Sequence, residues 1–223
     1  SERGPGGPAS PQGIRRLKPV LMVIAGPNGA GKTTVTARLR QDHWSEGVEY
    51  LNPDDVAQSR FGDWNSPQAT MQAAAWTTAR REELLGQRLG IAFETVFSTA
   101  EKVEFVRRAR EAGYFVRVFF VGTQDPRINA ARIAGRVMQG GHTVPIDKIV
   151  GRYAKSIANL SAAIALADRV YVYDNSVDDQ EARLCVRTES SELRKVYGPL
   201  PTWVEDTLTG LERHADFVDL RAA

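Results

Sequence analysis

Residues 20–34 read Val-Leu-Met-Val-Ile-Ala-Gly-Pro-Asn-Gly-Ala-Gly-Lys-Thr-Thr. The apolar run over residues 21–25 ends at a glycine, which is typical of a strand buried on both faces. The residues that follow match the phosphate-binding pattern Gly-x-x-x-x-Gly-Lys-Thr in full. Helix-forming residues then continue from Thr33 to Arg40. The sequence therefore predicts a buried strand, a phosphate-binding loop (P-loop) and a helix, in that order.

The residue types of this loop explain how it would hold a nucleotide. Glycines let backbone N–H groups turn toward an anion, and the start of the next helix adds the positive end of its dipole. Lys32 would place a charge between the β- and γ-phosphates, and the Thr33 hydroxyl would bind Mg²⁺. No Asn-Lys-x-Asp guanine motif occurs, which favours ATP over GTP. We expect ATP and Mg²⁺ as cofactors, with ATP bound by Gly26, Pro27, Asn28, Gly29, Ala30, Gly31, Lys32, Thr33 and Thr34.

The composition limits the class of protein. The 223 residues suit one α/β domain, and a hydrophobic fraction of 42% is enough for a core. The net charge of +2 indicates no global field for nucleic acid, so a nucleic-acid partner is not expected. The only cysteine, Cys185, excludes a disulfide framework. No apolar run could cross a membrane and no secretory signal is visible, so we expect a cytoplasmic protein without a membrane partner.

Strand and helix patterns alternate after the loop. We expect strands at 49–51, 91–97, 115–121, 169–173, 184–187 and 195–197, and helices at 66–89, 100–112, 125–139, 145–167 and after Pro201. Gly90, Gly113 and the glycines 140–141 are the expected helix ends. The order predicts an α/β P-loop NTPase/kinase fold, with a central parallel sheet, helices on both faces and an arginine-bearing lid. Residues 1–13 are expected to form a disordered tail, and residues 14–223 a single kinase domain.

Polar residues follow several of the predicted strands, at the edge where ligands of such sheets bind. Asp54 is a candidate general base that would accept the proton of an attacking hydroxyl. Capping of the next helix by Asp54 or Asn52 explains the same residues equally well. Glu94 ends an apolar strand segment and is a candidate ligand for Mg²⁺ or for a substrate hydroxyl. Asn175 lies where an adenine could rest, although an ordinary Asx turn accounts for it too.

Arginines follow in the second half of the chain. Arg132 and Arg136 are four residues apart, so their guanidinium groups would share one face of a helix. Arg152 comes one helix later, and His142 between them is a candidate base or structural hydrogen-bonding residue. Arginines on a lid stabilise the charge that develops on a transferred phosphoryl group. A solvated basic face is the alternative interpretation of the same spacing.

Several motifs occur together in a specific order, and on them the chain resembles the zeta-toxin family of P-loop kinases. The resemblance covers residues 20–176 and rests on segments 25–34, 51–57, 93–98, 132–136, 140–145, 152–153, 159–160 and 173–176, with Ser156. It implies a toxin that phosphorylates a sugar hydroxyl of a UDP-activated amino sugar of the UDP-N-acetylglucosamine type. It also implies a separate antitoxin protein as a partner.

The resemblance also implies roles for individual residues. Asp54 would be the general base, and Lys32 and Thr33 would hold ATP with Mg²⁺. Arg136, with Arg132 or Arg152, would clamp the γ-phosphate. The residues expected to bind substrate are Asp54, Glu94, Thr95 and Ser98, and Glu94 would also belong to the metal shell. Many family members carry a second threonine where this chain has Val96, which would alter the acceptor pocket.

Three other hypotheses stay open at this point. The acceptor could be another hydroxylated metabolite, such as a dinucleotide or an antibiotic. A nucleic-acid end kinase would need a basic channel with aromatic platforms. A nucleotide-dependent switch without an acceptor would leave Asp54 idle.

Overall fold

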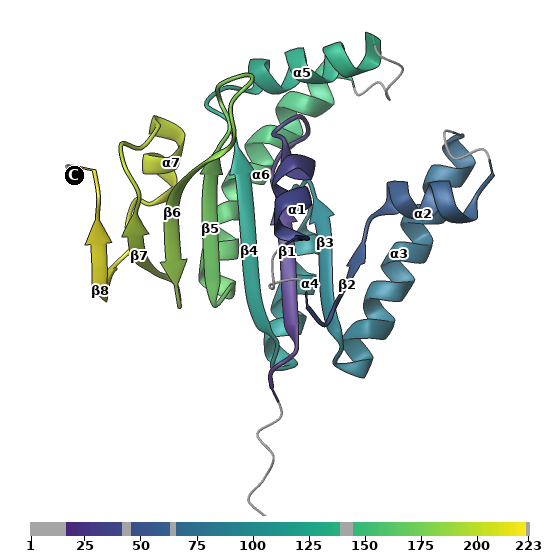
Figure 1. Ribbon diagram of the computed structural model, residues 1–223, viewed down its shortest axis with the longest axis horizontal. Coiled ribbons are helices and arrows are strands. Elements are labelled where there is room, and N and C mark those ends of the chain that lie inside the picture. Colours follow the sequence, from purple (N-terminus) through teal and green to yellow (C-terminus); the bar gives the residue numbers. More distant parts are fainter. Residues whose placement is uncertain (1–16, 42–45, 63–65, 139–144, 222–223) are drawn as a thin grey trace, which may run out of the picture.

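The computed structural model describes residues 17–41, 46–62, 66–138 and 145–221. A single eight-stranded sheet runs through them in the order β2-β3-β1-β4-β5-β6-β7-β8 (Figure 1). The strands are β1 Val20–Ala25, β2 Val48–Leu51, β3 Gly90–Thr95, β4 Phe115–Gly122, β5 Arg169–Asp174, β6 Arg183–Glu189, β7 Glu192–Val196 and β8 Arg213–Asp219. The helices are α1 Lys32–Leu39, α2 Pro53–Arg60, α3 Pro67–Gln87, α4 Ala100–Glu111, α5 Pro126–Met138, α6 Ile146–Leu166 and α7 Thr202–Thr207.

The predicted α/β fold is confirmed, but the sheet is mixed. The first five strands of the order, β2 to β5, pair in parallel. Strand β6 pairs antiparallel with both β5 and β7, and β8 pairs parallel with β7. A two-residue turn joins β6 to β7, with φ of 50° at Ser190 and 70° at Ser191. Two positive φ values in a row are those of a type I′ hairpin turn, which reverses the chain without a crossover helix.

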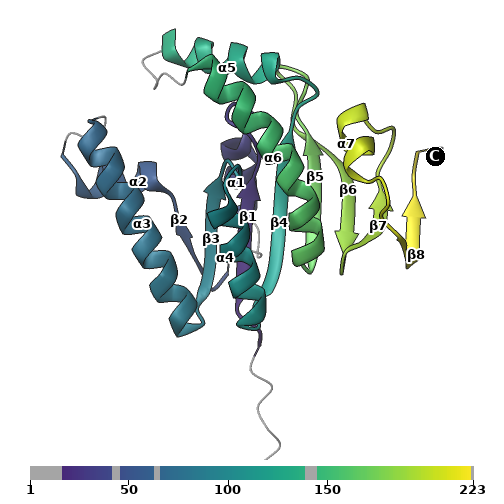
Figure 2. The ribbon, with the colours of Figure 1, turned by 180° about the vertical axis from the view of Figure 1, so that it is seen from behind.

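Helices cover both faces of the sheet, as predicted. One face packs its apolar side chains against α4, α6 and α7 through residues such as Phe105, Leu160 and Trp203 (Figure 2). The other face packs against α1 through Val35 and Leu39. The edge formed by the carboxyl ends of β1, β3, β4 and β5 lies between these layers and carries the loops discussed below (Figure 1).

Some predicted boundaries are wrong for identifiable reasons. Helix α3 ends at Gln87 because Arg88 takes the left-handed conformation with φ of 56°, and Gly90 begins β3 instead of ending the helix. Strand β3 ends at Thr95 because Phe97 also has a φ of 56°. Strand β8 was not predicted from the sequence. The expected tail 1–13, the helix end at residues 140–141 and His142 lie outside the described residues.

Candidate active site

The P-loop joins β1 to α1, and its glycines permit two close approaches. At Gly26, where φ is 144°, a Cβ atom would lie 2.0 Å from the carbonyl oxygen of Val121. At Gly29, where φ is 76°, it would lie 2.6 Å from the carbonyl oxygen of Asn129. A side chain at either position would displace backbone, so the loop is packed tightly against β4 and the start of α5.

Lys32 is the first residue of α1 and folds back over the loop. Its Nζ donates hydrogen bonds to the carbonyl oxygens of Gly26, at 2.9 Å, and Pro27, at 3.0 Å. Burial lowers the pKa of Lys32 to about 8, while the negative charge of Glu94 raises it and the positive charge of Arg136 lowers it. The fold therefore brings Lys32, Glu94 and Arg136, from three different elements, into one electrostatic cluster.

Two asparagine side chains brace the P-loop. Nδ2 of Asn129 donates to the carbonyl oxygen of Asn28 at 2.6 Å, and Nδ2 of Asn175 donates to that of Ala30 at 2.8 Å. The C=O and N–H of a trans peptide point in opposite directions. The N–H groups of Gly29 and Gly31, which share these two peptides, therefore face away from the asparagine side chains. Asn129 is fully buried, and Thr123 donates a hydrogen bond to its Oδ1. Sequence reasoning missed Asn129, since a polar residue early in a helix carries no signal of a contact 101 residues away.

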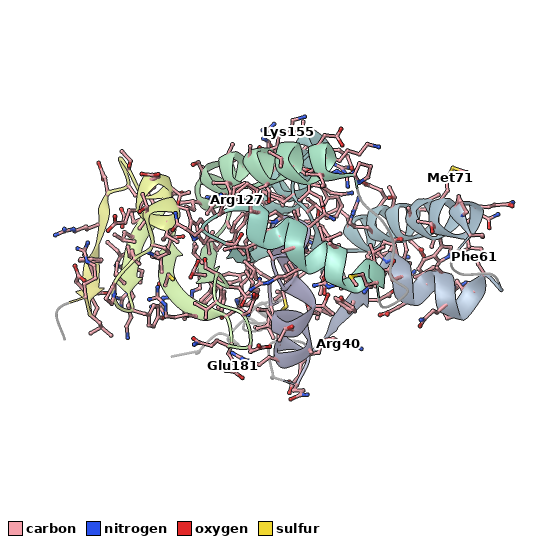
Figure 3. The ribbon with its side chains drawn as sticks, turned by 90° about the horizontal axis from the view of Figure 1, so that it is seen from above. Arg40, Phe61, Met71, Arg127, Lys155 and Glu181 are labelled. Atoms are coloured by element: carbon pink, nitrogen blue, oxygen red, sulfur yellow. The ribbon has the colours of Figure 1, made fainter. Side chains whose placement is uncertain are left out.

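A cleft of about 500 Å³ opens beside the loop, between α5 and the segment after β5. Its lining includes Thr34, Arg132, Arg136 and Asn175. Figure 3 views this edge from above and shows α5 extending from Arg127 across it. The predicted shared face of Arg132 and Arg136 is therefore turned to the cleft.

Hydrogen bonds hold in place the wall of this cleft that is formed by the segment after β5, residues 175–180. Arg132 donates to the carbonyl oxygen of Asn175 at 2.8 Å and forms an ion pair with Asp178 at 2.7 Å. Trp203 of α7 donates from Nε1 to Asp174 at 2.8 Å, which ties the C-terminal segment to the same wall. Arg152 instead lies exposed on α6 and does not line the cleft.

Asp54 stands in the first turn of α2, two residues after the capping residue. Asn52 Oδ1 accepts a hydrogen bond from the backbone N–H of Asp54 at 2.9 Å, so Asn52 is the N-cap. The side chains of Asp54 and Asp55 are exposed, at the positive end of the helix dipole. The capping interpretation thus applies to Asn52 and leaves the carboxylate of Asp54 available for another role.

Glu94 lies at the edge of a second, smaller pocket. Its Oε1 accepts a hydrogen bond of 3.0 Å from the hydroxyl of Tyr50, and burial raises the pKa of Tyr50, which keeps this hydroxyl a donor. The pocket has a volume of about 110 Å³, and Thr78 and Lys102 from α3 and α4 also line it. Tyr50 was not predicted as a site residue, because the pattern of a short strand does not reveal which neighbouring strand it will pair with.

Thr95 and Ser98 belong to the turn that follows β3. Thr95 Oγ1 accepts a hydrogen bond of 3.0 Å from the N–H of Phe97, and its carbonyl accepts one of 3.2 Å from Gly26. Asn159 of α6 donates to the carbonyl of Phe97 at 2.9 Å. The hydroxyl of Thr95 is thus engaged within the turn, and Ser98 is half-buried just beyond it.

The predicted Mg²⁺ ligands supply oxygen atoms, which this ion prefers. Thr33 is exposed at the start of α1, and Glu94 lies within electrostatic range of Lys32. Within the described ranges no group of three His, Cys, Asp or Glu residues could hold a metal ion. Mg²⁺ usually binds through one or two protein oxygens together with phosphates and water, so Thr33 and Glu94 are a fitting pair. In that same part of the chain, no helix is long and apolar enough to span a membrane.

The chain is similar to several known proteins. An uncharacterised protein of Haemophilus influenzae is 27% identical over 128 residues, covering 57% of this chain and 88% of that protein. A chain of the AvrRxo1-ORF1:-ORF2 complex with ATP has a TM-score of 0.60 at 16% identity, covering 80% of this chain and 60% of its own length. A chain from the PezAT toxin–antitoxin system of Streptococcus pneumoniae has a TM-score of 0.56 at 19% identity. That match covers 87% of this chain and 78% of the PezAT chain.

At these identities the solved structures establish the fold, and this chain spans only about 60% of the length of the AvrRxo1 chain. The sequence model described as Zeta toxin matches residues 9–188, which is most of the chain and includes every residue of the site from Gly26 to Asn175. The chain has the fold of a P-loop kinase and belongs to the zeta toxin family.

Proposed function

We propose that this protein is a kinase that transfers the γ-phosphate of ATP to a hydroxyl of a UDP-activated amino sugar, as the toxin of a toxin–antitoxin pair. The observation that carries the proposal is the cluster of Lys32, Glu94 and Arg136 around the P-loop. One cluster joins a phosphate-binding lysine, a carboxylate and an arginine from a lid helix, which are the parts that phosphoryl transfer requires.

ATP would lie with its phosphates on the P-loop and its nucleoside in the cleft of about 500 Å³ beside Asn175. Mg²⁺, held by Thr33 and Glu94, would neutralise charge on the phosphates. Lys32 would exchange its bonds to the carbonyls of Gly26 and Pro27 for bonds to phosphate oxygens. Arg136, with Arg132 beside it, would stabilise the charge on the transferred group.

The acceptor would enter from the side of β2 and β3. Asp54 would take the proton of the attacking hydroxyl, and the pocket beside Glu94 and Lys102 would hold part of the sugar nucleotide. The Asn129 and Asn175 bonds hold the loop before any ligand binds, so the phosphates would meet a loop that is already ordered.

The proposed partner is a separate antitoxin that covers the nucleotide cleft. The PezAT system is a toxin–antitoxin system, and the AvrRxo1 chain comes from a complex of two proteins. A partner at the cleft would stop turnover of every acceptor at once, whichever sugar nucleotide is used.

The test uses labelled ATP with UDP-N-acetylglucosamine, and in parallel with a bacterial metabolite extract. We expect label on the sugar nucleotide with the wild-type protein and none with Lys32→Ala. Label on a different metabolite would reassign the acceptor. A folded wild-type protein that binds ATP and labels nothing would contradict the kinase proposal. Growth arrest on expression, lost in Lys32→Ala and Asp54→Asn, would test the toxin role separately.

A further inference from the structure

One face of the sheet carries a concentration of positive charge far from the P-loop. Within the described residues, α1 is the helix that packs on this side, over β1 and β3. The same face of β4 to β7 presents four cations, two carboxylates and aromatic rings between them. We call these residues the sheet-face cluster: Arg117, Arg169, Tyr171, Arg187, Glu189, Glu192, Lys195 and Tyr197.

The strand register places like charges directly opposite one another. Arg117 on β4 pairs with Arg169 on β5, and Arg187 on β6 pairs with Lys195 on β7. In an antiparallel pair such as β6 and β7, directly opposed side chains lie about 5 Å apart at Cβ, and like charges at that spacing destabilise the sheet. These two pairs concentrate positive charge on the face, while the same register sets Glu189 opposite both Arg169 and Glu192.

The two carboxylates of the cluster, Glu189 and Glu192, do not balance its four cations. Glu189 lies 3.0 Å from Arg169 and 3.9 Å from Arg187, and Arg194 also approaches it at 3.8 Å. The Nε atoms of Arg169 and Arg187 are buried without a hydrogen-bond partner. Three guanidinium groups thus share Glu189, and only Arg194 among them also has Asp216 within 3.8 Å, in a chain whose net charge is only +2.

We propose that the sheet-face cluster docks an acidic segment of a partner polypeptide. Side-chain carboxylates pair with guanidinium groups in two-pronged hydrogen bonds, and a run of them would match cations on four adjacent strands. A single-stranded nucleic acid fits less well, because it needs open rings on which bases can stack. Tyr171 is only 5% exposed and stacks on Phe119 with ring centres 5.0 Å apart.

The position of the cluster separates this interaction from catalysis. Arg117 and Arg169 lie near the amino ends of β4 and β5, whereas Gly122 and Asp174 lie at the carboxyl ends, and Asn175, which follows Asp174, lines the nucleotide cleft. Five residues of strand separate Arg117 from Gly122, which is about 16 Å at 3.3 Å per residue. A partner on this face leaves the P-loop open, so the inference does not rest on the proposed function.

The experiment compares two doubly substituted proteins with the same change of charge. Arg187→Gln with Lys195→Gln alters the cluster, and Arg107→Gln with Lys148→Gln alters exposed positions on α4 and α6. Binding of a fluorescein-labelled peptide rich in glutamate is followed by anisotropy at low and high salt. ATP binding checks that each protein is folded. If the double variant of the cluster does not fold, the single variant Lys195→Gln replaces it.

We expect salt-sensitive peptide binding that weakens about ten-fold in the cluster variant and stays unchanged in the control. Absent binding, or equal loss in both variants, would overturn the proposal. Tighter binding of oligothymidylate, lost in the cluster variant, would assign the face to nucleic acid instead. A dimer in sedimentation that dissociates only in the cluster variant would assign it to a second copy of the chain.

Discussion

The lowered pKa of Lys32 makes nucleotide binding depend on pH in a defined direction. Burial disfavours the ammonium form and brings its pKa from 10.5 to about 8 in the ligand-free protein. Phosphate groups favour the ammonium form, so ATP binding should raise this pKa again. Above pH 8 the side chain must therefore take up a proton as ATP binds.

The size of this uptake follows from the two pKa values. If bound ATP restores the ordinary pKa, binding takes up about 0.1 proton at pH 7, about 0.5 at pH 8 and about 0.9 at pH 9. The same linkage weakens ATP affinity about ten-fold between pH 7 and pH 9. The stability of the ligand-free protein changes with pH in the opposite direction to its ATP affinity. A lysine whose pKa is lowered in the folded state opposes folding at low pH, so stability of the ligand-free protein should rise between about pH 8 and pH 10.5.

Isothermal titration calorimetry measures the proton uptake directly. Titrations at each pH in two buffers with different ionisation enthalpies give the number of protons as the slope of the observed enthalpy. Lys32→Met, which keeps the length of the side chain without its charge, should abolish the dependence. A slope that stays near zero at pH 9 would refute the reasoning, as would uptake that persists in Lys32→Met.

Three further substitutions test the site. Asp54→Asn should lower the rate of phosphotransfer about 100-fold or more with little change in ATP affinity, whereas Asp55→Asn should lower that rate far less. If single-turnover assays give the reverse order, Asp55 and not Asp54 is the general base. Arg136→Ala should lower kcat more than it weakens ATP binding, while Arg152→Ala should change kcat least. Steady-state kinetics in which Arg136→Ala lowers kcat and ATP affinity equally would contradict its role as a γ-phosphate clamp. Tyr50→Phe removes the hydrogen bond to Glu94 and should slow turnover about ten-fold or more at unchanged ATP affinity; an unchanged rate would show that this bond does not position the carboxylate.

The local parts of this protein could be predicted because their residues are neighbours in the chain. The P-loop needs glycines, a lysine and a threonine in one short segment between a buried strand and a helix, and all are consecutive. The N-terminus of α5 was predicted in the same way: Asp125 accepts a hydrogen bond of 2.8 Å from the N–H of Arg127, beside the proline that begins the helix. Such contacts span a few residues, so spacing alone determines them.

Contacts between distant segments were decided only by the tertiary structure. Asn129 reaches the P-loop across 101 residues, and Tyr50 reaches Glu94 across 44, because parallel strand pairing and helix packing bring these segments together. Strand register likewise placed Arg187 opposite Lys195 and so assembled the cationic face. A shift of one residue in that register would turn each side chain to the other side of the sheet. Periodicity predicts that a strand exists, but which residues meet across it depends on the whole fold.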